Sequence, residues 1–223
     1  MLITKHFVFV HLQKTGGNFV KAVCEQHLPA GWLVPNDLDD HTSFHRIPPE
    51  HAHLPVFSLI RNPWDWYVSW YHFTVQGPVG PQDEHPDSLW VRLFDRGRWD
   101  FRAAVTAACE GTSATLDPPP RWIRALRERD WDLYTLWYWQ LAGRGVEQGR
   151  VEVGRVETLR EDFIAFLRRH DVPVDDAFVD AVRSMPAANV STRGEYRDYY
   201  DERMRDLVAH KARLIVERYG YSF

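Results

Sequence analysis

An apolar run that leads into a glycine loop, and then into a helical pattern, most limits how this chain can fold. Residues 6–11 read HFVFVH, a short run rich in Phe and Val that is typical of a strand buried on both faces. The loop LQKTGG follows over residues 12–17, and the apolar residues of 19–24 then recur at helical spacing. A strand, a glycine loop and a helix in this order predict the opening of a βαβ unit.

The rest of the chain alternates between strand and helix patterns. Strands are expected at 56–60 and 151–156, and helices at 64 to about 75, roughly 88–109, 121–141, from 158 onward, 175–185 and 199–219. The helix after Thr158 has the spacing of a capping box, with Glu161 at its third position. We find no repeat and no linker, so the pattern predicts an α/β fold in one domain over 1–223, with a central parallel sheet flanked by helices.

Charge and composition exclude several classes of partner. The chain has 27 basic and 31 acidic residues and a formal net charge of −4, so we expect no general attraction to nucleic acid or to anionic membranes. The start of the chain lacks the pattern of a signal peptide, and no run of eighteen apolar residues occurs, which predicts a soluble, cytoplasmic protein. Any bound anion must therefore be held by local positive groups.

The glycine loop provides such groups. Gly16 and Gly17 let the backbone turn sharply and aim its amides inward, and the helix that follows adds its positive N-terminal end. Lys14 adds a charge, and it is one of only four lysines, the others being Lys5, Lys21 and Lys211. The lysine precedes the glycines, so the loop is not a Walker A motif. The pattern predicts an anion site, and the alternative is a simple strand–helix turn.

A second motif, RNPWDWYVS, covers residues 61–69. Arg61 lies at the carboxyl end of the strand 56–60, and Ser69 follows two turns into the next helix. Ligands of parallel α/β sheets bind at the carboxyl edge of the strands, which is where the glycine loop is also expected. An arginine fork and a serine hydroxyl suit a phosphate dianion, although alone this motif could equally be a structural ion pair.

Together the two motifs resemble those of the sulfotransferases that use 3′-phosphoadenosine 5′-phosphosulfate (PAPS), in particular the branch with carbohydrate-modifying and bacterial members. In that family a strand–KTGG[TS]–helix loop holds the 5′-phosphosulfate, and R-[DN]-P-x-x-R-x-x-S holds the 3′-phosphate. Residues 14–18 and 61–69 correspond to them here, and the resemblance continues over 154–163 and 189–223. Asn18 departs from the usual Thr or Ser, and Trp66 stands where many members have a second arginine.

The resemblance implies a P-loop nucleotide-hydrolase-like sulfotransferase fold. Residues of about 5–75 and 150–223 would bind PAPS, whose product is adenosine 3′,5′-bisphosphate, without a metal. The residues implied for the nucleotide are Lys14, Thr15, Gly16, Gly17, Asn18, Arg61 and Ser69, with Arg193 as an additional ligand of the 3′-phosphate.

The resemblance does not extend over a helical insert of about 76–149, and we expect this insert to recognise the acceptor, a small molecule or carbohydrate with a hydroxyl or amine. Its aromatic residues suit flat or sugar-like acceptors; they are Trp90, Phe94, Trp99, Trp122 and Trp131. The protein is expected to be a monomer or a homodimer.

The resemblance also implies an in-line transfer in which Lys14 stabilises charge on the departing bridging oxygen. The acceptor must lose a proton, and the loop 39–45 offers candidates for the base: His41 first, then His45, then Asp39. For each histidine, a purely structural or surface role is the alternative.

The histidines also allow a zinc interpretation, which we do not favour. His41, His45, His51 and His53 lie close in sequence, but no cysteine is near them and no HExxH spacing occurs.

Two other functions remain open. A phosphotransferase or nucleotide hydrolase could use a similar loop, but the chain lacks the Lys-[ST] pair and an obvious acidic ligand for magnesium at a strand end. A binding module could keep the nucleotide pocket without turnover. Magnesium dependence separates the first of these from a sulfotransferase, and turnover separates the second.

Overall fold

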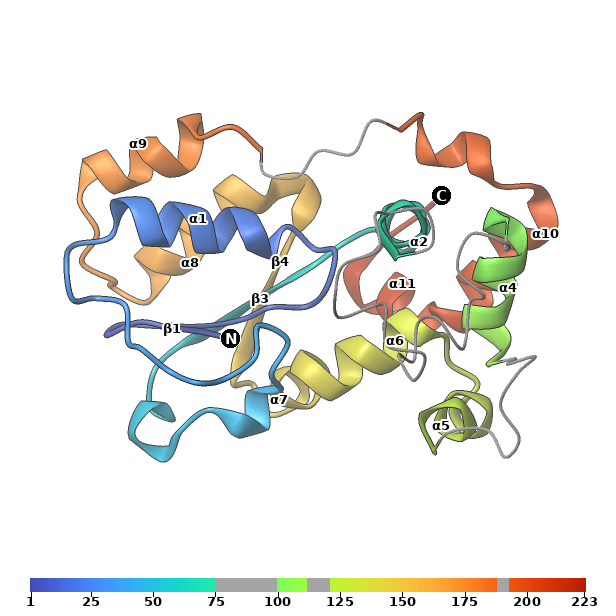
Figure 1. Ribbon diagram of the computed structural model, residues 1–223, viewed down its shortest axis with the longest axis horizontal. Helices are drawn as coiled ribbons and strands as arrows, with labels where there is room; N and C mark the ends of the chain where they lie inside the picture. The colour runs from blue at the N-terminus through green and yellow to red at the C-terminus, as the bar shows by residue number, and fades with distance from the viewer. Residues whose placement is uncertain (75–99, 112–120, 188–192) are drawn as a thin grey trace. The chain divides into compact units, whose positions relative to one another are not determined.

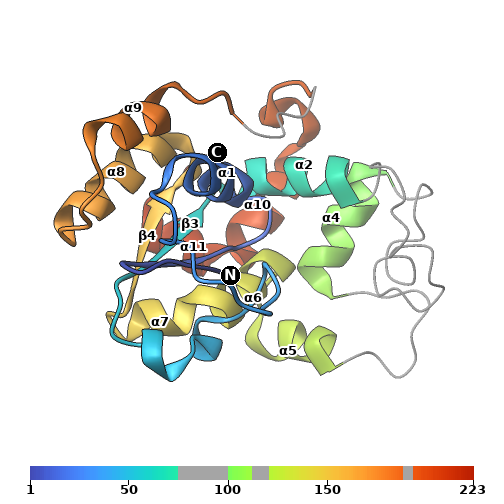
Figure 2. The same ribbon diagram turned by 60° about the vertical axis from the view of Figure 1, so that its left-hand side comes forward.

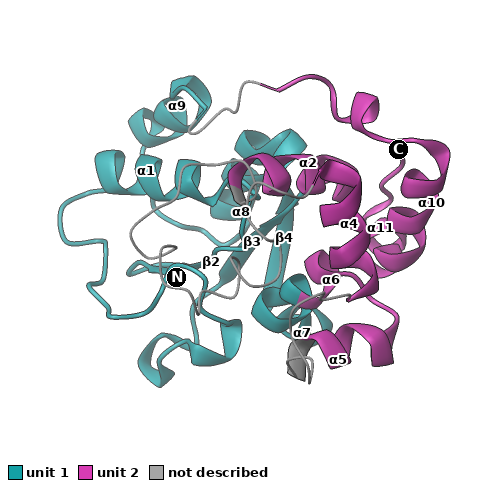
Figure 3. Cartoon of the chain, turned by 45° about the vertical axis from the view of Figure 1, so that its right-hand side comes forward, with its two compact units in different colours: residues 1–61, 137–190 teal, residues 62–136, 191–223 magenta. Residues whose placement is uncertain are grey.

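The computed structural model describes residues 1–74, 100–111, 121–187 and 193–223 of the chain (Figure 1). By their internal contacts the residues form two compact units (Figure 3). Unit 1 comprises Met1–Arg61 and Trp137–Val190, and unit 2 comprises Asn62–Leu136 and Ser191–Phe223. We describe each unit by itself, and one domain over 1–223 stays a prediction.

Unit 1 is built on a four-stranded sheet in the order β1-β2-β3-β4. The strands are β1 (Leu2–Ile3), β2 (Val8–Val10), β3 (Val56–Ile60) and β4 (Val151–Arg155). The β2–β3 and β3–β4 pairs are parallel, whereas β1 runs antiparallel to β2. The predicted α/β class with a mainly parallel sheet is therefore confirmed, and β1 is an addition that the sequence pattern did not predict.

Three helices of unit 1 cover one face of this sheet: α1 (Gly17–His27), α8 (Leu159–Arg169) and α9 (Asp176–Ser184) (Figures 1 and 2). Aromatic rings dominate the core beneath them. The Phe57 ring of β3 stacks on Phe163 and Phe166 of α8, with ring centroids 5.6 and 4.7 Å apart. Phe7 and Phe9 belong to the same buried cluster. Such packing of large rings is a main source of the stability of unit 1.

The alternate strand residues face the opposite side of the sheet. Val8, Val10 and Val56 form a second buried cluster with Ala142. Ala142 belongs to a π-helical turn, η4 (Trp139–Gly143), which is followed by α7 (Arg144–Glu147); the short 3₁₀ helices η1 (Phe44–Arg46) and η2 (Pro49–His51) complete this part of the unit. Because both faces are covered, β2 and β3 are buried at every position.

The start of α8 confirms the predicted helix but not its predicted cap. A 3₁₀ turn, η5 (Val156–Thr158), precedes the helix, and Thr158 makes no side-chain capping bond. Its hydroxyl instead donates to Asp162 at 2.8 Å, and the same carboxylate accepts from the Arg155 amide at 2.7 Å. The capping-box prediction is therefore wrong, because Asp162 takes the threonine hydroxyl and ties the end of β4 to the helix.

Unit 2 is helical in the residues described. It contains α2 (Pro63–Thr74), α4 (Phe101–Glu110), α5 (Arg121–Arg129), most of α6 (Leu133–Tyr138), η6 (Tyr196–Tyr199), α10 (Glu202–Lys211) and α11 (Arg213–Tyr219). In the described parts of the chain, no helix is long and apolar enough to cross a membrane. The predicted helix 88–109 falls mostly outside the described residues, and only its last part is seen in α4.

Two predicted continuous helices are broken. The helix predicted over 121–141 stops at Asp130, whose φ of 54° is left-handed, and the helix predicted over 199–219 is interrupted at Ala212. One ion cluster lies at both breaks. The Asp130 carboxylate lies 2.5 Å from the Lys211 ammonium and 3.0 Å from the Arg213 guanidinium, which flank Ala212.

Asp132 is a fully buried carboxyl group at the start of α6. Its Oδ1 accepts a hydrogen bond from the Thr135 amide at 2.7 Å, which caps the helix. Burial raises the pKa of this carboxyl above its ordinary value of 3.8. The folded chain thus holds the proton more tightly than the unfolded chain, so the contribution of Asp132 to stability falls as the pH rises from 3.8 through the folded pKa.

We therefore expect Asp132→Asn, which keeps the capping oxygen and removes the charge, to stabilise the protein at high pH. The free energy of unfolding should rise at pH 8 and change little at pH 4. Urea titrations at the two pH values measure this difference. An equal change at both would contradict it.

Candidate functional site

The turn between β2 and α1 has room only for glycine at two positions. Gly16 has a φ of 79°, in the left-handed region, and a Cβ there would lie 2.7 Å from Leu159 Cδ1. At Gly17, the first residue of α1, a Cβ would overlap the ring of His11. The adjacent glycines that the sequence singles out are thus required by backbone conformation at one position and by a close side-chain approach at the other.

The start of α1 suits an anion. The first turn of this eleven-residue helix carries no acidic side chain, so nothing opposes its positive end. Thr15 is buried and donates its hydroxyl hydrogen to the Leu12 carbonyl at 2.7 Å, which holds the loop closed on itself. Lys14 has a left-handed φ of 60°, and Asn18 is exposed on the first turn. The predicted loop residues are therefore together at the helix start.

Arg61 joins this loop, as the sequence predicted from its place at the end of β3. Its guanidinium Nη1 donates to the Lys14 carbonyl oxygen at 3.2 Å. The parallel pairing of β2 and β3 explains the contact, because it brings the carboxyl ends of both strands to one edge of the sheet. The Arg61 guanidinium therefore lies against the backbone of the glycine loop.

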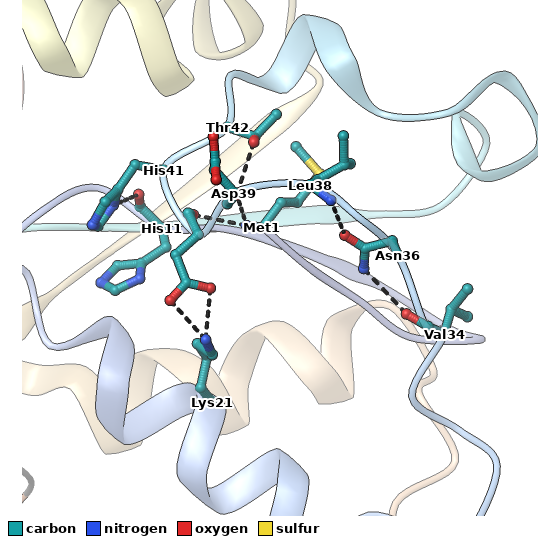
Figure 4. A network of polar contacts seen from close by, with 10 residues as sticks. Met1, His11, Lys21, Val34, Asn36, Leu38, Asp39, His41 and Thr42 are labelled. Atoms are coloured by element: carbon teal, nitrogen blue, oxygen red, sulfur yellow. Dashed lines mark hydrogen bonds and ion pairs between the residues drawn. The ribbon is translucent and has the colours of Figure 1, made fainter. Parts of the chain in front are cut away.

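His41, the favoured base, lies beside the same strand end (Figure 4). Its Nδ1 is 3.0 Å from the carbonyl oxygen of His11. A carbonyl oxygen can only accept, which assigns the hydrogen to Nδ1 and leaves the lone pair on Nε2. Burial lowers the pKa of His41 below its ordinary value of 6.5, outweighing the bond to His11 that raises it. His41 is thus a neutral imidazole at pH 7 that keeps an exposed face.

His11 is the site residue that sequence reasoning missed. It ends the predicted strand, the residue is 6% exposed, and its ring centroid lies 4.6 Å from that of His41. Burial lowers the pKa of His11 to about 3, so the ring is neutral at physiological pH and cannot pair with a phosphate as a cation. Its position against Gly17 could be anticipated only from the fold.

The other predicted candidates of the loop 39–45 lie apart from these contacts. The His45 ring packs edge-on against Phe44, with centroids 5.2 Å apart, and the Asp39 carbonyl accepts from the Thr42 hydroxyl at 2.7 Å. Roles for His45 and Asp39 as bases stay predictions. Among the residues described, no group of three His, Cys, Asp or Glu side chains could hold a metal ion.

The remaining nucleotide candidates belong to unit 2. Ser69 lies on α2 with 8% of its surface exposed. The Arg193 guanidinium forms an ion pair of 2.5 Å with the Asp65 carboxylate and donates to the Asp65 carbonyl at 3.3 Å. A phosphate would have to share this guanidinium with Asp65. The assignments of Ser69 and Arg193 to the 3′-phosphate stay predictions.

Position 66 belongs to an aromatic core of unit 2. The Trp66 side chain is fully buried and stacks on Tyr134, with ring centroids 4.3 Å apart and planes 13° apart. It also stacks on Trp70 at 5.9 Å. An arginine at this position would lie in an aromatic core, so Trp66 contributes to packing and not to a phosphate site.

The predicted aromatic surface for the acceptor is described only in part. Trp90, Phe94 and Trp99 lie outside the described residues, as does the side chain of Trp122. Trp131 packs beneath the Arg129 guanidinium, 4.9 Å from the ring centroid. Recognition of the acceptor by this insert stays a prediction.

A cavity of about 460 Å³ lies elsewhere in unit 1, lined by His53, Val56, Arg150, Glu152 and His170 among others. It lies at the first residues of β3 and β4, whereas the loop of Lys14 lies at the carboxyl edge of the sheet. Ligands of parallel α/β sheets bind at the carboxyl edge, so we place the functional site at the loop.

No protein-family model matches the chain, and no curated protein matches it by sequence. A solved structure does: mouse sulfotransferase SULT7A1, crystallised in complex with PAP, matches with a TM-score of 0.56. The two chains are 14% identical, and the match covers 97% of this chain and 88% of that one. At this identity the likeness is one of fold, and the protein has a sulfotransferase-like fold.

Proposed function

We propose that this protein is a sulfotransferase that moves the sulfuryl group of PAPS to a hydroxyl or amine of a small-molecule or carbohydrate acceptor. One observation carries the proposal. The Lys14–Gly17 loop joins a lysine, a glycine turn and an acid-free helix start at the edge of the sheet where Arg61 follows β3. The similarity in fold to a sulfotransferase solved with PAP supports it.

The loop provides most of the proposed nucleotide contacts. The backbone amides at the start of α1, including those of Gly17 and Asn18, suit the 5′-phosphosulfate of PAPS. Thr15 contributes through its backbone, since its hydroxyl hydrogen is already donated to Leu12. Arg61 adds a cation beside Lys14. Ser69 and Arg193 are assigned to the 3′-phosphate on the resemblance of their motifs.

The proposed transfer needs one base and one stabilised leaving group. The acceptor oxygen or nitrogen attacks sulfur, and the bond between sulfur and the bridging oxygen of the 5′-phosphate breaks. Lys14 stabilises the negative charge that develops on this oxygen. The acceptor proton moves to Nε2 of His41, the ring nitrogen that the hydrogen bond to His11 leaves with a lone pair.

A calorimetric titration with adenosine 3′,5′-bisphosphate, with and without EDTA, tests the nucleotide site. We expect micromolar binding that EDTA does not change and that Arg61→Ala weakens by about 10–100-fold, because a hydrogen bond to a charged group contributes about 1.5–3 kcal/mol. Arg168→Ala, an exposed arginine of α8, is the matched control and should bind as the wild type does. Ser69→Ala and Arg193→Ala test the two assignments in unit 2.

Other outcomes favour the alternatives. Binding that requires magnesium and is restricted to ATP or GTP would place the phosphotransferase first. Tight, magnesium-independent binding without turnover on any acceptor would indicate a binding module.

A further inference from the structure

Lys21 is a rare lysine that the proposed reaction does not use. It lies in the second turn of α1, the helix that begins at the glycine loop. Its ammonium is held by both carboxylate oxygens of Asp40, at 2.6 and 2.7 Å (Figure 4). Asp40 immediately precedes His41, so the ion pair joins the helix of the anion site to the loop of the proposed base.

The loop that contains Asp39, Asp40 and His41 makes further contacts. The Asp39 and Asp40 carbonyls accept from the Met1 nitrogen at 2.5 and 2.7 Å. On the other side of Asp40, the His41 ring donates to the His11 carbonyl at the end of β2. The Asp40 side chain is thus a contact that fixes this loop to α1, while the His41 ring fixes it to the strand.

We propose that Lys21 is a positioning residue for His41: its ion pair with Asp40 holds the loop so that Nδ1 of His41 stays on the His11 carbonyl and Nε2 faces the acceptor. The use of this lone pair in transfer rests on the proposed function. The placement itself rests on the contacts of Lys21, Asp40, His41 and His11.

The charges around His41 determine in which direction its pKa should shift when Lys21 or Asp40 is replaced. The charged groups that act on the His41 ring include the Asp40 carboxylate, the Lys21 ammonium and the Met1 amine, while His11 acts through its backbone carbonyl and places its own ring 4.6 Å away. Asp40 raises the pKa of His41, and Lys21 lowers it. Burial opposes ionisation of Asp40 itself, but the hydrogen bonds and charge of Lys21 outweigh burial and lower the pKa of that carboxyl.

Nitrogen-15 NMR of the histidine rings tests the proposal without an acceptor. In the wild type we expect the Nδ1–H tautomer of His41 and a pKa below 6.5. Lys21→Met should raise this pKa, because the Asp40 charge is then uncompensated, and should mix the two tautomers. Asp40→Asn should lower the pKa. Lys21→Arg should restore the wild-type pattern, and Lys5→Met, at an exposed lysine of unit 1, should leave it unchanged.

Activity gives a second readout once an acceptor is identified. Lys21→Met should lower kcat by about 10–100-fold, because a misplaced base is inefficient. It should also shift the pH profile of kcat, and leave the KM for PAPS and the affinity for adenosine 3′,5′-bisphosphate near the wild-type values.

Different results would contradict the proposed function and the positioning role of Lys21. A wild type that binds no nucleotide overturns the proposed function, whereas the NMR pattern of His41 still decides the role of Lys21. Shifts of the His41 pKa in the same direction in Lys21→Met and Asp40→Asn, or an unchanged tautomer in both, would overturn that role. If Lys21→Met does not fold, Asp40→Asn decides, with Lys21→Arg as the control that keeps the ion pair: an unchanged His41 tautomer in Asp40→Asn would overturn the role.

Discussion

Lys14→Ala is expected to lower the rate of sulfuryl transfer by about 10²–10³-fold, the loss typical of removing one group that stabilises charge in a transition state. The ammonium of Lys14 is the proposed partner of the oxygen that departs from sulfur, and its loop is already fixed by Thr15 and by Arg61. The measurement is transfer of labelled sulfuryl from PAPS to an acceptor found by screening. Adenosine 3′,5′-bisphosphate binding should weaken by less than the rate falls, because the charge matters most in the transition state.

The backbone of Lys14 offers a matched control for this variant. Its φ of 60° is unfavourable for any residue with a side chain, and glycine adopts it without cost. Lys14→Gly should therefore be at least as stable as Lys14→Ala and equally impaired in transfer. A Lys14→Gly protein that transfers at the wild-type rate would show that the lysine serves no chemical purpose.

Gly17→Ala is expected to damage both stability and nucleotide binding. A Cβ at this position overlaps the buried His11 ring, which lies beneath the first turn of α1. Either the ring or the helix start must move, at a cost of about 1–3 kcal/mol in the free energy of unfolding. Displacing the helix start also misplaces the amides that would hold the phosphosulfate, so we expect affinity for adenosine 3′,5′-bisphosphate to fall by at least about 10-fold.

A second substitution separates this clash from a general loss of structure. Removing the ring in His11→Ala makes room for the methyl group, so the double variant should be more stable than the sum of the single changes predicts. Gly194→Ala is the control, since its Cβ would meet only Asp198 Oδ2 at 3.9 Å. Strict additivity of the two changes, or a Gly17→Ala protein as stable as the wild type, would contradict the close approach to His11.

The parts of the fold that follow from local patterns were predictable. The run at 6–11 contains β2, the run at 56–60 is β3, and the spacing at 19–24 marks the buried face of α1. The Lys14 loop and Arg61 could be placed at one edge because parallel strands align their carboxyl ends. Placing these residues at one edge of the sheet requires no knowledge of contacts between residues distant in sequence.

Features set by distant contacts were not predictable. The helical pattern continues through Asp130 and Ala212, yet both helices are interrupted where Asp130 meets Lys211 and Arg213. Strand β1 has only two residues, too few for a periodic signal. Likewise, nothing in the sequence near Lys21 indicates its ion pair with Asp40, and nothing near Gly17 indicates that the ring of His11 packs against it.

The aromatic core of unit 1 has a consequence for the order in which parts of the protein can fold during synthesis. Phe57 is covered by Phe163 and Phe166, and β3 gains its second parallel neighbour, β4, only when Val56 pairs with Val151. A nascent chain that ends before α8 therefore exposes the rings of β2 and β3, and completion of the sheet is a late, non-local step. The glycine loop lies within the first 28 residues, but the sheet that supports it is not complete until β4 has left the ribosome.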